Sequence, residues 1–179
     1  MATTYEPLVS ASLSSAGTSI TVSSIPTTGY TDLVVVINHL AYYASGTYLT
    51  GGLQVGNGSI DTATNYSNTY LYGDGTTAGS SYTNTNAYVR YIDIPATPTD
   101  NGSRGSVIIN IMNYANTSYK KTMLIRSNSV QSSTGTNMLR TFSATWQGTS
   151  AINTIKFTNI DGTNFYAGTT IAVYGIKAA

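Results

Sequence analysis

Short runs of residues that alternate between apolar and polar side chains recur along this chain, with turn residues between them. In the clearest run, Phe142, Ala144 and Trp146 alternate with threonine and serine. Side chains point to opposite faces along a β-strand, so a period of two predicts strands with one buried face. Glutamate occurs only at Glu6, and the abundance of serine, threonine, glycine and asparagine disfavours helices. The sequence therefore predicts an all-β protein.

Turn residues divide these runs into strands of ordinary length. The expected strands are residues 5–13, 19–23, 31–40, 48–55, 86–94, 106–113, 120–130, 138–147, 151–160 and 168–176. The run from Leu33 to Ile37 is apolar on both faces, which predicts a central strand covered on both sides. About eight to ten strands at this spacing predict an antiparallel, jelly-roll-like β-sandwich.

The domain organisation follows from length and local composition. A chain of 179 residues suits one domain, so we expect a single β-sandwich over residues 1–179, with residues 1–12 as an extended N-terminal arm. Residues 56–85 are rich in glycine, asparagine, serine and tyrosine and predict a long loop, with room for a short strand near Tyr66–Tyr72. Loops of this length are commonly functional or ordered by a partner.

The charge of the chain is low and balanced. Charged residues make up 8% of the sequence and the net charge is +1, which predicts neither nucleic acid nor a membrane surface as a partner. The longest apolar run, Leu33 to Ile37, is too short to span a bilayer. The N-terminus has no basic start and no apolar core of a signal peptide, so we expect a protein made in a cytoplasm and soluble or assembled there.

Low charge combined with 15 tyrosines suggests a subunit that packs against other subunits in an assembly. A free monomer with few charges is poorly soluble, whereas a subunit packed in an assembly escapes part of that demand. Tyrosine is favoured at interfaces because it offers a large area and a polar tip. The alternative is that tyrosine and threonine are here because they form strands well. Composition alone leaves both interpretations open.

Residues that could carry catalysis are scarce, and we predict no catalytic residue, metal site or cofactor. The absence of cysteine excludes a thiol nucleophile and thiolate metal ligands. His39, the only histidine, could act as a general base or metal ligand, but without a carboxylate motif beside it a hydrogen-bonded structural role is favoured. A glycosidase pair formed by Asp61 and Asp74 stays conceivable, although Asp74-Gly75 is an ordinary turn signal.

Tyrosines gather in and around the predicted long loop. They are Tyr42, Tyr43, Tyr48, Tyr66, Tyr70, Tyr72 and Tyr82. Aromatic faces stack on pyranose rings, and nearby amides could bond sugar hydroxyls, so a sugar-binding surface is one interpretation. A packing or subunit surface is the other.

Several short strings follow one another in a consistent order along nearly the whole chain. They are 3–8 (TTYEPL), 19–26 (SITVSSIP), 30–35 (YTDLVV), 65–67 (NYS), 111–117 (IMNYANT), Trp146 ahead of 151–155 (AINTI), and 174–177 (YGIK). This order resembles a group of short β-sandwich virion proteins of tailed bacteriophages, of the kind found in cyanophages.

The resemblance implies a non-enzymatic virion structural protein, assembled in the host cytoplasm. Its leading implication is a capsid decoration (cement) protein, expected as a homotrimer, that binds the major capsid protein lattice or other virion proteins. The alternative is a tail or fibre appendage protein that binds a host surface glycan. The predicted assembly contacts are Tyr5, Pro7, Leu8, Tyr66, Tyr70 and Tyr72. A polysaccharide-degrading enzyme is a third reading, disfavoured by the scarcity of histidine, glutamate and cysteine.

Overall fold

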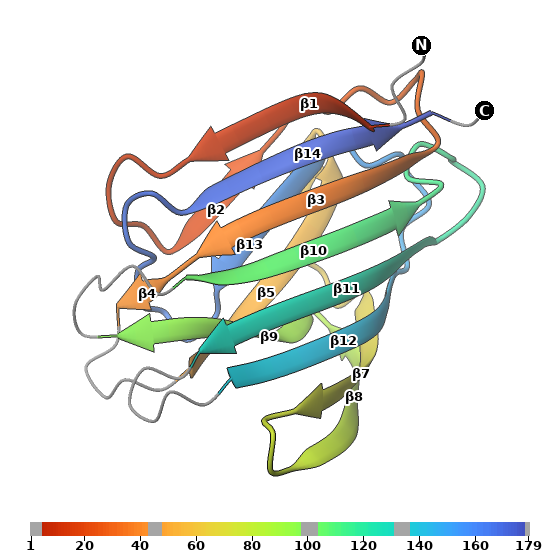
Figure 1. Cartoon of the computed structure of the whole chain (residues 1–179). Helices are drawn as coiled ribbons and strands as arrows, with labels where there is room; N and C mark the ends of the chain where they lie inside the picture. The colour runs from red at the N-terminus through yellow and green to blue at the C-terminus, as the bar shows by residue number, and fades with distance from the viewer. Residues whose placement is uncertain (1–4, 43–47, 98–103, 131–136, 178–179) are drawn as a thin grey trace.

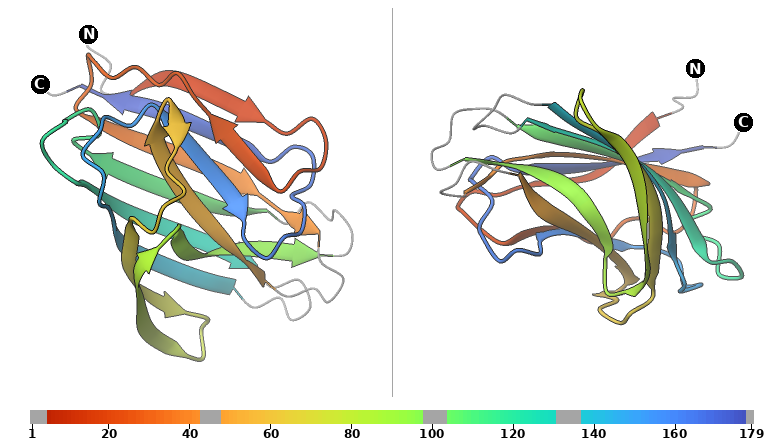
Figure 2. Two further views of the ribbon diagram at one scale, coloured as in Figure 1. Left: turned by 180° about the vertical axis from the view of Figure 1, so that it is seen from behind. Right: turned by 90° about the horizontal axis from the view of Figure 1, so that it is seen from below.

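The computed structural model describes residues 5–42, 48–97, 104–130 and 137–177, and every regular element in these ranges is a β-strand. Two sheets pack face to face (Figures 1 and 2). All strand pairs are antiparallel except the short pair of β4 with β9. The predicted all-β antiparallel sandwich is therefore confirmed. In the described part of the chain, no helix is long and apolar enough to cross a bilayer.

The larger sheet has eight strands and faces the viewer in Figure 1. In spatial order it contains β1 (Tyr5–Ser12), β14 (Thr170–Ile176), β3 (Asp32–His39), β10 (Gly105–Met112), β11 (Lys121–Val130), β12 (Asn137–Trp146), β7 (Tyr66–Gly73) and β8 (Ala78–Asn86). The β7–β8 hairpin forms one edge and β1 forms the other.

The smaller sheet covers one face of the larger sheet and lies in front when the molecule is seen from behind (Figure 2). In spatial order it contains β2 (Ser19–Val22), β13 (Thr154–Asn159), β5 (Tyr48–Asn57), β9 (Val89–Thr97) and β4 (Ala41–Tyr42), with β6 (Ser59–Ile60) paired to β5. The structure thus has more strands than the sequence predicts, and β4 and β6 are two-residue pieces.

The core fills the space between the sheets and is built by the predicted alternation. Phe142, Ala144 and Trp146 of β12 are buried, and each intervening residue is more exposed. In β3, Leu33, Val35 and Ile37 are fully buried against the other sheet. Val34 is also buried on the opposite face, whereas Val36 is only half-buried. β3 is therefore central, as predicted, but its outer face is only partly covered.

The N-terminal segment is part of the sheet along its described residues. Residues 5–12 form the edge strand β1, which pairs with β14 from Tyr5 opposite Ile176 to Ser12 opposite Thr170. The predicted strand over residues 5–13 is therefore confirmed. The extended arm predicted over residues 1–12 is wrong for residues 5–12, and residues 1–4 lie outside the described ranges. The backbone groups of this segment find partners on β14, which a free arm would lack.

The segment 56–85 is mostly strand, so the predicted long loop is corrected. It holds β6, β7 and most of β8, and only the expected short strand near Tyr66–Tyr72 agrees with the structure. The segment looks polar because its buried face carries Asn68 as well as tyrosines. The side-chain oxygen of Asn68 accepts bonds from the Thr83 hydroxyl and the Arg90 backbone N–H, so this oxygen is satisfied, whereas the side-chain nitrogen has no hydrogen-bond partner.

Candidate functional site

A large hollow of the described structure lies where the two sheets meet beside the β7–β8 hairpin. Strands β7, β8 and β12 of the larger sheet face β5 and β9 of the smaller one around a cavity of about 590 Å³, referred to below as the groove. It is lined by Thr50, Tyr70, Tyr72, Asp74, Thr77, Ser80, Ser81, Tyr91, Asp93, Met138 and Arg140. Its volume falls within the usual range for small-ligand sites.

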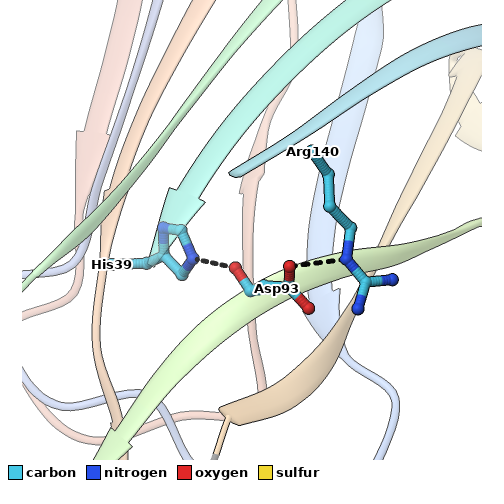
Figure 3. A network of polar contacts seen from close by, with 3 residues as sticks. All are labelled: His39, Asp93 and Arg140. Carbon is cyan, nitrogen blue, oxygen red and sulfur yellow. Dashed lines mark hydrogen bonds and ion pairs between the residues drawn. The ribbon is translucent and has the colours of Figure 1, made fainter. Parts of the chain in front are cut away.

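A buried ion pair forms the wall of the groove (Figure 3). Nε of Arg140, on β12, lies 2.6 Å from Oδ2 of Asp93, on β9, and the two residues are 8% and 3% exposed. Neither of these two atoms has a partner with hydrogen-bond geometry, so the contact is a charge pair rather than an aligned hydrogen bond. Both atoms are enclosed by the protein, so the charge pair is shielded from solvent.

The ionisation of Asp93 depends on this environment. Burial raises the pKa of Asp93 to about 6, although the positive charge of Arg140 acts in the opposite direction. Asp93 is consequently ionised at pH 7, and the pair holds a full positive and a full negative charge. On acidification below about pH 6, the carboxyl group takes up a proton and the pair is lost.

Two tyrosine rings contact the arginine side chain, and a third ring lies beside one of them. The guanidinium carbon of Arg140 lies 5.0 Å from the ring centre of Tyr70 and 5.6 Å from that of Tyr72, which is cation–π geometry. The rings of Tyr70 and Tyr91 are 5.6 Å apart between centroids. This arrangement fixes aromatic surface and a cation side by side in the groove.

The backbone of β9 is irregular where it reaches the groove. Tyr91 has φ +69°, a left-handed conformation that is uncommon for a tyrosine, and the pairing of β5 with β9 shifts register beside it. The ordinary alternation is interrupted there, because Val89 and Ile92 are both fully buried. Such irregularities gather at functional sites, where they redirect side chains.

His39 lies behind the groove and supports it. Its Nε2 lies 3.1 Å from the backbone carbonyl oxygen of Asp93 and donates to it in the neutral ring (Figure 3). The ring also meets Phe157 edge-on, with 5.1 Å between the ring centroids. Burial lowers the pKa of His39 to about 4, so the ring is neutral at pH 7. This geometry agrees with the hydrogen-bonded structural role that the sequence favours.

Asp61 and Asp74 do not form the pair that a glycosidase would need. Oδ1 of Asp74 accepts bonds from the backbone N–H groups of Thr76 and Thr77, and these bonds lower the pKa of Asp74. Asp61 lines a different hollow, where its Oδ2 accepts a bond of 2.7 Å from the indole N–H of Trp146. In the described ranges, no group of three or more acidic, histidine or cysteine residues could hold a metal ion.

The predicted contact residues are dispersed by the fold. Tyr5 and Pro7 are exposed on β1, and Leu8 is half-buried against the core. Tyr70 and Tyr72 come together in the groove. Tyr66 is fully buried, so it is not available as a surface contact. Its inward position follows from the same alternation that places Tyr70 and Tyr72 inside.

Of the other tyrosines in and around residues 56–85, Tyr82 is exposed outside the groove, and the side chains of Tyr42, Tyr43 and Tyr48 lie outside the described residues.

The sequence did not single out Tyr91, Asp93 and Arg140 as site residues. A signal existed for Arg140, because it occupies an inward position in the apolar alternation of residues 138–146.

No family model and no curated protein matches this chain. Among solved structures, it is similar to the CBM2 module of the evolved Dit of Lactobacillus casei BL23 phage J-1, at 10% identity over 90% of this chain and 69% of that chain, with a TM-score of 0.29. It is also similar to the CBM40 of the Ruminococcus gnavus IT-sialidase bound to α2,3-sialyllactose, at 14% identity over 97% of this chain and 95% of that chain, with a TM-score of 0.31. Similarity at this level assigns no function to the chain.

Proposed function

We propose that this chain is a non-enzymatic binding protein of a bacteriophage particle and that the groove holds a carbohydrate. One observation carries the proposal: three tyrosine rings and a buried arginine–aspartate pair line the same cavity as several hydroxyl side chains. The C–H face of a sugar ring packs on an aromatic ring, and sugar hydroxyls bond strongly to charged groups. A phage origin rests on the resemblance described above.

The charge of the groove favours a neutral sugar. Asp93 neutralises Arg140 at 2.6 Å, so an anionic group would have to compete with a partner already in place. A pair of adjacent hydroxyls makes better use of the two side chains, because one hydroxyl donates to the carboxylate and the other accepts from the guanidinium. Ser80, Ser81 and Thr77 supply further hydroxyl groups around the cavity.

The contacts that the two aspartates of the groove already make argue against catalysis. A glycosidase needs one carboxyl group that donates a proton and a second that acts as nucleophile or base. In the groove, Asp74 is engaged by the N–H groups of its own turn and Asp93 by Arg140. Incubation with oligosaccharides should accordingly release no new reducing ends. Cleavage that is lost in Asp93→Asn would overturn the non-enzymatic part of the proposal.

Binding is tested by titrating ¹⁵N-labelled protein with a panel of neutral and anionic oligosaccharides. We expect saturable shifts for neutral sugars, and Tyr72→Ala should weaken binding by about tenfold or more because a stacking face is lost. Tyr82→Ala is the matched control, since Tyr82 is exposed and does not line the groove. Equal affinity in Tyr72→Ala and the unchanged chain would contradict the proposal, as would the absence of binding at millimolar sugar.

A second candidate function is decoration of a phage head, with the major capsid protein as partner and a homotrimer as the assembled form. The observation that favours it is the exposure of Tyr5 and Pro7 on β1, which is an edge strand of the larger sheet. Cryo-electron microscopy of the native particle tests it. Threefold clusters of density over the capsid lattice would support decoration, whereas density confined to the tail would contradict it.

A further inference from the structure

Exposed apolar side chains of the described residues gather on one side of the molecule. Six large ones are more than half exposed, and five belong to the larger sheet: Tyr5, Leu71, Tyr82, Leu124 and Leu139. Leu71, Leu124 and Leu139 alternate with more buried neighbours along their strands, and the strand register places Tyr5 and Tyr82 on the same side of the sheet. The outward-pointing side chains of the larger sheet are called the outer face below.

The strand register places the side chains of this outer face in shared cross-strand rows. Leu124 of β11 lies opposite Asn110 of β10, which lies opposite Val34 of β3, which in turn lies opposite Tyr174 of β14. The next row along the strands contains Ile108 and Val36 as direct neighbours. Tyr174 and Val34, and Ile108 and Val36, are thus direct apolar neighbours. Leu124 lies between Asn110 and Ser143 in its row, so the outer face mixes apolar with neutral polar side chains.

The outer face carries very little charge. Three successive cross-strand rows, those through Tyr174, Ala172 and Thr170, contain a single charged side chain, Arg126. The remaining polar groups in these rows are neutral, mainly serine, threonine and asparagine. A face with so few charged side chains does not repel an identical face. It also offers no complementary charges to a strongly charged partner.

The size of the outer face matches a stable dimer. Eight strands about 4.8 Å apart and about seven residues long span an area on the order of 800 Å². Standard protein interfaces bury about 800 Å² on each partner. The outer face is therefore large enough to hold a second copy without help from other surfaces.

We propose that the outer face packs against the outer face of a second copy of this chain, in a two-fold symmetric dimer. Sheets that stack in this way lie about 10 Å apart and cross at about 30°. Such a contact is self-complementary, so each exposed leucine is buried on both copies of the chain. The groove stays open, because Tyr70 and Arg140 occupy the inward positions of β7 and β12.

Sedimentation equilibrium of the full chain tests the dimer. We expect a mass of twice 18.9 kDa for the unchanged protein. Leu124→Arg/Leu139→Arg should raise the dissociation constant of the dimer by at least about tenfold, because charges are buried on both copies. Tyr119→Arg is the matched control: Tyr119 is 66% exposed but lies in the loop between β10 and β11.

Several results would overturn the dimer. They are a monomer at about 0.1 mM, a trimer, a double variant that stays fully dimeric, or a loss of dimer in Tyr119→Arg as large as in the double variant. Thermal unfolding of each variant verifies that it is folded. Sugar titration of the double variant separates the two proposals, because a monomer that binds sugar normally supports the outer face as the dimer contact and leaves the groove intact.

Discussion

Arg140 and Asp93 connect the two sheets of the sandwich through a buried ion pair. Arg140 belongs to β12 of the larger sheet and Asp93 to β9 of the smaller one, and Nε and Oδ2 are 2.6 Å apart. Removal of one member of a buried pair leaves the other charge without compensation, whereas replacement of both by apolar groups is often neutral. The pair therefore ties the shape of the groove to the stability of the fold.

Arg140→Met should lower the free energy of unfolding by about 3 kcal/mol, and Asp93→Leu by a similar amount. The double variant should lose much less than both single losses together, because no charge is left buried. Urea unfolding at pH 7 measures all three. Lys177→Met is the control, since Lys177 pairs with Glu6 at the surface and its loss should have little effect. Additive losses in the double variant would contradict this account.

His39 and Asp93 make opposing contributions to stability on acidification. The pKa of Asp93 is raised from 3.8 to about 6, so the folded chain binds the extra proton and gains stability as the pH falls from 6 to 4. The pKa of His39 is lowered from 6.5 to about 4, so the unfolded chain binds the proton and stability is lost over the same range. The two contributions should nearly cancel.

His39→Gln removes the loss of stability that His39 causes on acidification. Between pH 7 and pH 4.5 the variant should gain about 2 kcal/mol of stability relative to the unchanged protein. Urea unfolding at the two pH values measures the change. A variant whose stability follows the same pH dependence as the unchanged protein would mean that His39 is not held neutral by burial.

Tyr66 should contribute to the stability of the fold as a core residue, and not to binding as a surface contact. Its hydroxyl accepts a bond of 3.0 Å from the Val55 backbone N–H and lies within donating distance of the Asp61 carbonyl. Tyr66→Phe leaves buried groups without partners and should cost about 1–3 kcal/mol in urea unfolding. Tyr82→Phe, at an exposed ring, is the control. Unchanged stability in Tyr66→Phe would show that these bonds contribute nothing.

Gly79 keeps the groove open for Tyr72. A Cβ at position 79 would lie 2.6 Å from the Tyr72 hydroxyl oxygen, so the ring would have to move. Gly79→Ala should weaken sugar binding by about tenfold and change the melting temperature little, because the far end of a side chain yields first. In Gly73→Ala the new Cβ meets only an ordinary contact at 3.8 Å. If both variants bind equally well, Tyr72 is not part of the sugar site.

The local pattern of the sequence determines most strands of this protein. The alternation of Phe142, Ala144 and Trp146 identifies β12 and its buried face, because side-chain direction along a strand depends only on the period of two. The same rule applies to β7, but there the inward positions hold Asn68 beside tyrosines. The surrounding segment 56–85 was therefore predicted as a loop with room for only a short strand near Tyr66–Tyr72. Its strand character depends on partners, since the buried side-chain oxygen of Asn68 accepts bonds from Thr83 and Arg90.

The groove and the outer face depend on tertiary structure. Asp93 and Arg140 meet only because β9 and β12 lie in facing sheets, and no local pattern carries the order of strands. Likewise Leu71, Leu124 and Leu139 are ordinary exposed residues until the register places them on one face. The sequence alone therefore determined the β class and the buried positions, which are local properties. Strand pairing decided the sites, because it brings distant side chains together.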